Sequence, residues 1–215
     1  MARTFRSARS PSSMSIATVQ TIRKIVLWLA VIVGIFFFAV STSRYPSDGT
    51  LHEMIEWTGI VLIVVCILGR TWASLYIGGR KIDQLVTIGP YSVTRNPLYF
   101  FSILGAIGVG MQVGSIVLGL ICGALAATVF AVVVVQEEHL LAARYKKRYR
   151  DYLASVPRFI PDPRRWRDEK TLTIRPPRVL MTFADALVFL LSVPLAEGFE
   201  YLQEIGAIPV LFHLW

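Results

Sequence analysis

The amino-acid sequence predicts an all-α integral membrane protein with four to five transmembrane helices. Of its 215 residues, 54% are hydrophobic and only 17% are charged, and the mean hydropathy is +0.58. Long apolar runs at such a composition are typical of membrane-spanning helices. The composition also excludes a disordered chain, a coiled coil and a disulfide scaffold, since Cys66 and Cys122 both lie inside apolar runs.

The first two predicted transmembrane helices lie within residues 25–80. One apolar run extends from Ile25 to about Ser43, and the next from Ile55 to Ile77. At 1.5 Å per residue, each is about long enough to cross a hydrocarbon core of roughly 30 Å. Residues 1–24 carry five Lys or Arg and no acidic residue, which predicts a basic cytosolic tail. An organelle transit segment has a similar composition and is the alternative.

A short helical hairpin follows. The apolar run from Leu98 to Met111 has 14 residues and reaches roughly 21 Å, less than the thickness of the core. The next run, Ser115–Val135, has 21 residues, and only three residues separate the two runs. We therefore expect two antiparallel neighbouring helices. Apolar and aromatic residues recur after Val135, which predicts that the second helix continues beyond the membrane.

The last part of the chain, residues 179–215, is a C-terminal hydrophobic segment. Its apolar run, Val179–Ala196, is interrupted by Asp185 and Pro194. Both a fifth transmembrane helix and a re-entrant or interfacial helix are consistent with this run. Residues 162–178 are rich in proline and charge, which predicts a linker.

The distribution of basic residues predicts the orientation. Along an in–out–in–out–in path, 21 of the 22 Lys and Arg fall on one side, and only Arg44 falls on the other. By the positive-inside rule, that side is the cytoplasm. We therefore expect a multi-pass protein, in the inner (plasma) membrane if the source is bacterial, with a cytoplasmic N-terminus. Topology also accounts for the net charge of +8, so no nucleic acid partner is expected.

The sequence lacks the short motifs of common metal and nucleotide sites. It has three histidines and contains no HExxH, CxxC, Walker-type or GxGxxG pattern, so no metal site is expected. Gly105, Gly108 and Gly110 lie within one predicted helix, where small residues usually allow close helix packing.

Two polar clusters are candidates for a site. One runs from Leu85 to Tyr99 and also fits a structural loop with interfacial tyrosines. The other, Glu137–Glu138, also fits a solvated pair beside basic residues. Adjacent helical residues point about 100° apart, so at most one carboxylate is expected to face a given pocket. The hairpin returns both clusters to one membrane face, within reach of a cytosolic cofactor and a lipid tail.

Residues 85–161 resemble the isoprenylcysteine carboxyl methyltransferase family, which is related to the phospholipid N-methyltransferases. The motifs occur in the family's order: LVTIGPYSVTRNPLY, EEHLL and RYKKRYRDYLASVPRFIP. The resemblance implies methyl transfer from S-adenosyl-L-methionine by a helical membrane fold with a cytoplasmic catalytic C-terminal region. It places a methyltransferase-like core, including the hairpin, at residues 81–161.

The resemblance also implies which residues hold the cofactor. They belong to the first loop, to the start of the short helix and to the acidic pair: Leu85, Val86, Tyr91, Asn96, Pro97, Leu98, Tyr99, Glu137 and Glu138. Glu137 or Glu138 can pair with the cofactor's ammonium or ribose hydroxyls, and tyrosine rings can face its cationic centre.

The sequence departs from the family pattern at two places. Asn96 stands where the family commonly has histidine; it forms hydrogen bonds but does not titrate near neutral pH. The family's arginine before the glutamates, which meets the substrate carboxylate, is absent, since residues 132–136 read VVVVQ. Arg95 and Arg70 are the catalytic candidates in its place. Arg70 lies in an apolar run, where an arginine indicates function, although snorkelling to the interface explains it equally well.

Several functions remain open at this stage. The leading one is O-methylation of a prenylcysteine carboxylate or another lipidic acceptor, and N-methylation of an aminolipid is the close alternative. A sterol-type reductase with a nicotinamide cofactor and a non-catalytic membrane protein are further alternatives. The expected partners are the membrane and a lipid or prenylated acceptor, and the oligomeric state is left open.

Overall fold

The computed structural model describes residues 32–47, 49–77 and 85–215. The basic tail predicted at residues 1–24 and the start of the first apolar run lie outside these ranges. Residues 32–40 are helical. The remaining helices, in chain order, are α2 (Thr50–Ile77), α3 (Pro90–Val93), α4 (Pro97–Met111), α5 (Ile116–Ser155), the 3₁₀ helix η1 (Pro163–Arg165), α6 (Pro176–Leu187), the 3₁₀ helix η2 (Val188–Leu191) and α7 (Ser192–Glu204).

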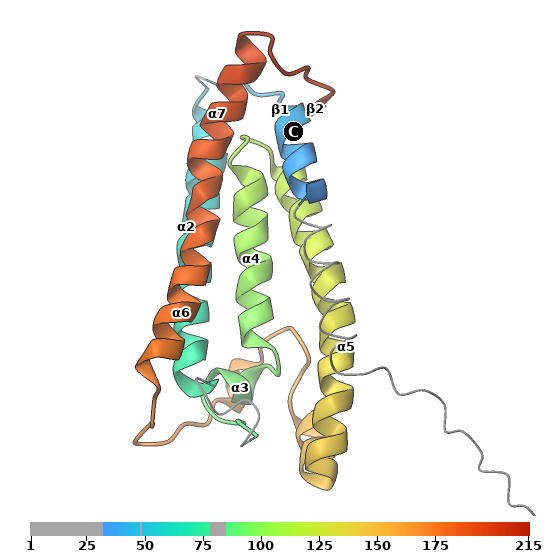
Figure 1. Cartoon of the computed structure of the whole chain (residues 1–215), viewed down its shortest axis with the longest axis vertical. Helices are drawn as coiled ribbons and strands as arrows, with labels where there is room; N and C mark the ends of the chain where they lie inside the picture. The colour runs from blue at the N-terminus through green and yellow to red at the C-terminus, as the bar shows by residue number, and fades with distance from the viewer. Residues whose placement is uncertain (1–31, 48, 78–84) are drawn as a thin grey trace, which may run out of the picture.

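The helices form an elongated bundle. Helix α4 lies between α2 and α5, and α6 and α7 follow one another alongside α2 (Figure 1). The short α3 lies at one end of the bundle, where α2 ends and α6 begins. The opposite end carries two short strands, β1 (Ser41–Ser43) and β2 (Phe212–Leu214). The chain therefore crosses the length of the bundle repeatedly, as the alternating path predicts.

Three helices of the described part are long and apolar enough to cross a membrane. They are α2, α5 and the rod formed by α6, η2 and α7, which spans Pro176–Glu204. The last apolar segment thus has the length of a fifth span. Pro194 does not end it, because it lies in the first turn of α7, where a backbone N–H has no helical partner to lose. Helix α4 is apolar but shorter than the other three.

The hairpin of α4 and α5 has the boundaries that the apolar runs indicate. Pro97 occupies the first turn of α4, where its fixed φ favours a helix start. Ser115 caps α5, since its Oγ accepts a hydrogen bond from the Leu118 amide at 3.1 Å. Helix α5 then continues to Ser155, well past the apolar run, as predicted.

Small residues bring α2 and α4 close together. A Cβ built on Gly108 would lie 2.5 Å from the carbonyl oxygen of Gly59, and one on Gly105 would lie 2.6 Å from Sγ of Cys66. Such distances are shorter than any real Cβ contact, so side chains at these positions would push the two helices apart. Close packing of α2 on α4 follows from these glycines.

The helical fold class is confirmed, and two features add to the sequence-based expectation. Strands β1 and β2 form a two-stranded parallel sheet. Three-residue strands carry no readable periodicity, and their pairing satisfies backbone groups between distant segments. The segment expected as a linker is also packed in part. The ring of Trp166 stacks on Trp72 with centroids 5.5 Å apart, and the Tyr76 hydroxyl donates to Asp168 Oδ2 at 2.9 Å.

Candidate functional site

The loop before α4 turns at a glycine that no other residue can replace without strain. Gly89 has φ +57°, in the left-handed region that L side chains rarely adopt. A Cβ at this position would also lie 2.2 Å from Cε1 of Tyr76. The Gly89 amide donates to the carbonyl oxygen of Arg167 at 2.7 Å. The turn therefore sits tightly between the end of α2 and the segment after η1.

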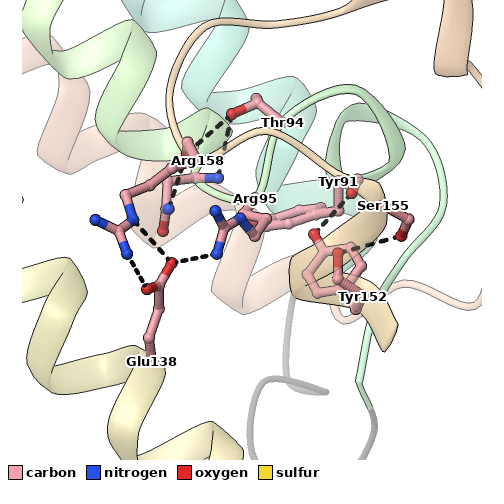
Figure 2. Close-up of polar contacts among 8 residues, drawn as sticks. Tyr91, Thr94, Arg95, Glu138, Tyr152, Ser155 and Arg158 are labelled. Atoms are coloured by element: carbon pink, nitrogen blue, oxygen red, sulfur yellow. Dashed lines mark hydrogen bonds and ion pairs between the residues drawn. The ribbon is translucent and has the colours of Figure 1, made fainter. Parts of the chain in front are cut away.

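The residues after α5 hold the rest of this loop. The Thr94 hydroxyl lies 3.2 Å from the carbonyl oxygen of Arg158 and 3.1 Å from that of Phe159. The Asn96 amide group donates to the Arg158 carbonyl at 3.0 Å, and the Arg95 backbone amide donates to Pro157 O at 2.9 Å. Figure 2 shows the first of these contacts around Arg158. The start of α4 is thus positioned by the VPRFIP motif.

Aromatic residues of α5 fix the other side of the loop. The Tyr152 hydroxyl donates to the carbonyl oxygen of Tyr91 at 2.7 Å (Figure 2), and the rings of Tyr149 and Tyr152 lie 6.0 Å apart. Both rings are buried. Lys146, with φ 47° and ψ −116°, breaks the helical geometry just before them. This break changes the direction in which the last part of α5 presents its tyrosines.

An ion network joins α5 to the loop before α4 and to the segment that follows α5. The Glu138 carboxylate accepts from Arg95 Nη1 at 2.7 Å and from Arg158 Nη2 at 2.7 Å (Figure 2). Arg158 Nε lies 3.2 Å from the same carboxylate. Glu138 therefore has two cationic partners, which fix the distance between α5 and the start of α4.

These elements enclose a polar pocket of about 630 Å³, including the part open to solvent. Ten of the eleven residues predicted for the site line it: Leu85, Val86, Tyr91, Arg95, Asn96, Pro97, Leu98, Tyr99, Glu137 and Glu138. Both residues of the acidic pair line the pocket. The roles of these residues stay predictions.

Arg70 is the one predicted residue outside the pocket lining. Its Nη1 donates to the hydroxyl of Ser102, which joins α2 to α4, and its buried Nε has no hydrogen-bond partner in the described part of the chain. Ser102 in turn donates to the Leu98 carbonyl at 2.7 Å. Arg70 thus contacts the helix that carries the pocket residues, not the pocket itself.

The Tyr91 hydroxyl is a buried polar atom without a partner among the described residues. Its ring lies in the pocket wall, and the side chain is 5% exposed. Burial, and then the nearby hydroxyls of Tyr152 and Tyr99, raise the pKa of Tyr91 well above its usual value. A neutral hydroxyl that lacks a partner is costly unless a ligand supplies one. The pocket therefore fits a polar ligand.

Sequence reasoning left four lining residues unassigned. Ile77 ends α2, Leu141 follows the acidic pair, and Tyr149 and Tyr152 come from the last part of α5. Arg158, which pairs with Glu138, was also not assigned. All except Ile77 fall in or near the EEHLL and RYKKRYRDYLASVPRFIP motifs, which were the available signal.

Comparisons with known proteins agree with this architecture. Residues 56–148 match the family model of the phospholipid methyltransferases. The nickel-cobalt-cadmium resistance protein NccN of Alcaligenes xylosoxydans xylosoxydans is 32% identical over 171 residues, which cover 79% of each chain. The chain belongs to the NccN family. A second member, the cobalt-zinc-cadmium resistance protein CzcN of Cupriavidus metallidurans, is 30% identical over 162 residues, 75% of this chain and 74% of CzcN.

The matches to the NccN family and to the phospholipid methyltransferase model confirm the coarser part of the expected resemblance. They support its phospholipid methyltransferase side, whereas the carboxyl methyltransferase assignment stays a prediction. The matched region includes both helices of the hairpin and the acidic pair. It ends before Tyr149 and Tyr152, which line the pocket, and before Arg158, which pairs with Glu138. No solved structure matches this chain.

Proposed function

We propose that this protein is a membrane methyltransferase that transfers a methyl group from S-adenosyl-L-methionine to the polar end of a lipid. The observation that carries the proposal is the polar pocket at the α3 end of the hairpin, where a carboxylate, an unpartnered tyrosine hydroxyl and aromatic rings converge. The positive-inside distribution supports a pocket that faces the cytoplasm, in the inner membrane of a bacterium.

The residues of the pocket fit a cationic nucleoside. Glu137 is suited to the ammonium or ribose hydroxyls, and the Tyr91 hydroxyl to a polar acceptor atom of the ligand. Tyr99 lines the same pocket as the acidic pair, and an aromatic ring there is suited to a cationic centre. When bound, S-adenosylmethionine supplies a methyl group on a positively charged sulfur. The chain's own task is to align the acceptor with that group and to exclude water, and the apolar residues Ile77, Leu85 and Leu141 serve the second purpose.

The ion network favours an amine over a carboxylate as the acceptor. A prenylcysteine carboxylate, the acceptor implied by the resemblance, needs a cationic partner. Arg95 and Arg158 both bind Glu138 already, so a substrate carboxylate would compete with Glu138 for them. An aminolipid nitrogen needs no arginine. The match to the phospholipid methyltransferase model supports the same choice.

A methyl-transfer assay on the full chain in lipid nanodiscs tests the proposal. Radiolabelled S-adenosylmethionine is offered with phosphatidylethanolamine or with farnesylcysteine, in separate reactions. We expect label in the aminolipid. Label only in farnesylcysteine would reverse the choice of acceptor, and a stable protein that labels neither would reject methyl transfer to both classes. Titration with NADPH in place of S-adenosylmethionine tests the reductase alternative.

The role of Glu137 is tested by cofactor binding rather than turnover. Glu137→Gln keeps the size of the side chain and one acceptor oxygen but removes its charge. We expect S-adenosylmethionine affinity to fall about tenfold or more while the protein still inserts in the membrane, because hydrogen bonds to charged groups are the stronger ones. Gln136→Ala, one position away, is the control and should keep the affinity of the unaltered protein.

We propose that the protein contributes to metal resistance through the membrane lipid. The names of NccN and CzcN connect those relatives with nickel, cobalt, cadmium and zinc. Within the described ranges, no group of three or more His, Cys, Asp or Glu is placed to hold a metal ion. Methylation of an ethanolamine headgroup keeps its net charge but replaces N–H hydrogen-bond donors by methyl groups, which changes the membrane surface that the cations meet. Growth of a deletion strain carrying Glu137→Gln on cobalt or cadmium is the test: full resistance would separate the phenotype from methyl transfer.

A further inference from the structure

An apolar pocket lies inside the bundle, separate from the polar pocket. It has a volume of about 960 Å³, including the part open to its surroundings. Its walls come from the helix at residues 32–40, from α4, from α5 and from the region of η2 and α7. The Ser192 hydroxyl in its wall donates to the carbonyl oxygen of Phe189 at 2.7 Å. This polar group is satisfied within the protein, so the pocket fits hydrocarbon.

One pair of stacked aromatic rings lies between the two pockets. Tyr99 lines the polar pocket and Phe130 lines the apolar one. Their rings stack with centroids 4.8 Å apart and planes inclined by 28°. The two pockets are therefore neighbours across one ring contact between α4 and α5.

The distances between the two pockets along the α5 axis match the length of a molecule with a polar headgroup and a hydrocarbon tail. Phe130 precedes Glu137 by seven residues, which is about 10 Å along the helix axis. The apolar pocket extends back to Cys122, a further eight residues or about 12 Å. A polar headgroup near Glu137 would thus continue into a chamber deep enough for a long hydrocarbon chain, at the depth of the apolar part of α5.

We infer that the apolar pocket binds the hydrocarbon tail of the methyl acceptor, and that residues 32–40 and 188–199 select the tail. The inference rests on the proposed function. The part of the chain that matches the phospholipid methyltransferase model, residues 56–148, supplies only the α4 and α5 walls. The remaining walls come from outside it, and Gly34, Phe189 and Leu195 are among their residues. The methyl-transfer core and the tail selector are therefore separate parts of the chain.

Gly34 offers a substitution that fills the chamber without displacing the protein. A Cβ at Gly34 meets nothing within 4 Å, although Gly34 is part of the pocket wall. Gly34→Phe therefore places a ring in the open space. Gly198 in α7 is the matched control, because a Cβ there also meets nothing and Gly198 is exposed and outside the pocket wall. Ala126→Phe, on the α5 wall, is a second filling variant if Gly34→Phe does not fold.

Photo-crosslinking tests the inference without requiring turnover. The probes are phosphatidylethanolamine and farnesylcysteine, each with a diazirine at the end of its tail, added to the full chain in nanodiscs. We expect cross-links to residues 188–199 and to the pocket wall of α5. Gly34→Phe should reduce them about tenfold or more, as the loss of several buried methylenes implies, and Gly198→Phe should leave them unchanged. The two probes distinguish an acyl tail from an isoprenoid tail.

The outcomes separate this inference from the proposed function. In the methyl-transfer assay, Gly34→Phe should raise KM for a long-tailed acceptor and leave a short-tailed acceptor with the same headgroup unaffected. Cross-links in the pocket with no methyl transfer to any acceptor would reject the proposed function alone. Methyl transfer with cross-links outside the pocket, or an equal loss in Gly198→Phe, would overturn the tail site alone.

Discussion

Arg95 and Glu138, 43 positions apart in the sequence, form an ion pair of 2.7 Å in the wall of the polar pocket. Their side chains are only 13% and 12% exposed. The pair connects the start of α4 to α5, which indicates a structural role for Glu138, and a ligand-binding role for Glu137 stays a prediction. The two neighbouring carboxylates are therefore expected to respond differently to substitution.

Glu138→Ala should destabilise the protein by about 2–4 kcal/mol, because Arg95 would remain largely buried without a countercharge. Unfolding of the purified protein in mixed micelles measures the free energy. Arg158→Ala is the control. Its side chain is 46% exposed, so its loss should cost about 0.5–1 kcal/mol. Equal losses for both variants would show that burial of Arg95 does not determine the cost.

Tyr91→Phe should stabilise the ligand-free protein by about 1 kcal/mol, since it removes a buried hydroxyl that has no partner among the described residues. It should weaken S-adenosylmethionine binding about tenfold, as expected for one buried hydrogen bond. Titration calorimetry measures the affinity. A large loss of stability with unchanged affinity would instead assign the hydroxyl a structural role.

Stability should also depend on alkaline pH through Tyr91. Burial raises the pKa of Tyr91 well above its ordinary value, so the folded protein keeps a proton that the unfolded chain releases above about pH 10. The stabilisation is complete below that pH and decreases as pH rises, by up to about 1.4 kcal/mol per unit. Tyr91→Phe should remove this part of the slope. Superimposable pH profiles of the two proteins would contradict the shift.

Gly89→Ala should destabilise the protein by about 2–4 kcal/mol, because strain at positive φ adds to a clash with the Tyr76 ring. Gly206→Ala separates the two effects. Gly206 has φ +72°, but a Cβ there meets nothing within 4 Å, so only backbone strain of about 1–2 kcal/mol remains. Thermal unfolding of both variants provides the comparison, and equal shifts would show that the clash is relieved by movement of Tyr76.

Lys146→Gly should stabilise the protein by about 1 kcal/mol, because glycine adopts φ 47° without the strain of a side chain. The same substitution at Lys147, in regular helix geometry, should cost about 1 kcal/mol. The difference in unfolding free energy between the two variants is the measurement. Two equally destabilised variants would show that α5 passes through residue 146 as a regular helix in solution.

The hairpin was accessible from the sequence because local signals specify it, whereas the individual pocket residues were accessible through the resemblance to a known family. Apolar run length places the α4 boundary within one residue, since the run begins at Leu98 and the helix at Pro97. The LVTIGPY loop precedes the first helix of the hairpin, and the acidic pair lies late in the second. Because the two helices are antiparallel neighbours, the loop and the acidic pair meet at the same end of the hairpin. The individual roles of these residues stay predictions until a ligand is bound.

Other parts depend on long-range geometry that no local pattern specifies. The choice of Glu138 rather than Glu137 as the partner of Arg95 depends on the rotation of α5. The contact of Arg70 with Ser102 depends on which faces of α2 and α4 meet. The backbone break at Lys146 occurs at a residue with no preference for positive φ. Only the three-dimensional structure reveals these features.

The contacts that hold the loop before α4 against residues 157–167 have a consequence for biosynthesis. Ser92 accepts a hydrogen bond from the Arg167 amide, 75 positions later in the chain. At about 5–20 residues per second, the ribosome needs roughly 4–15 seconds to add the residues between them. Throughout that interval the hairpin is already synthesised while its polar loop lacks its permanent partners. Completion of the polar pocket is therefore a late event of translation, and a nascent chain interrupted before Arg158 lacks the segment that holds the loop before α4.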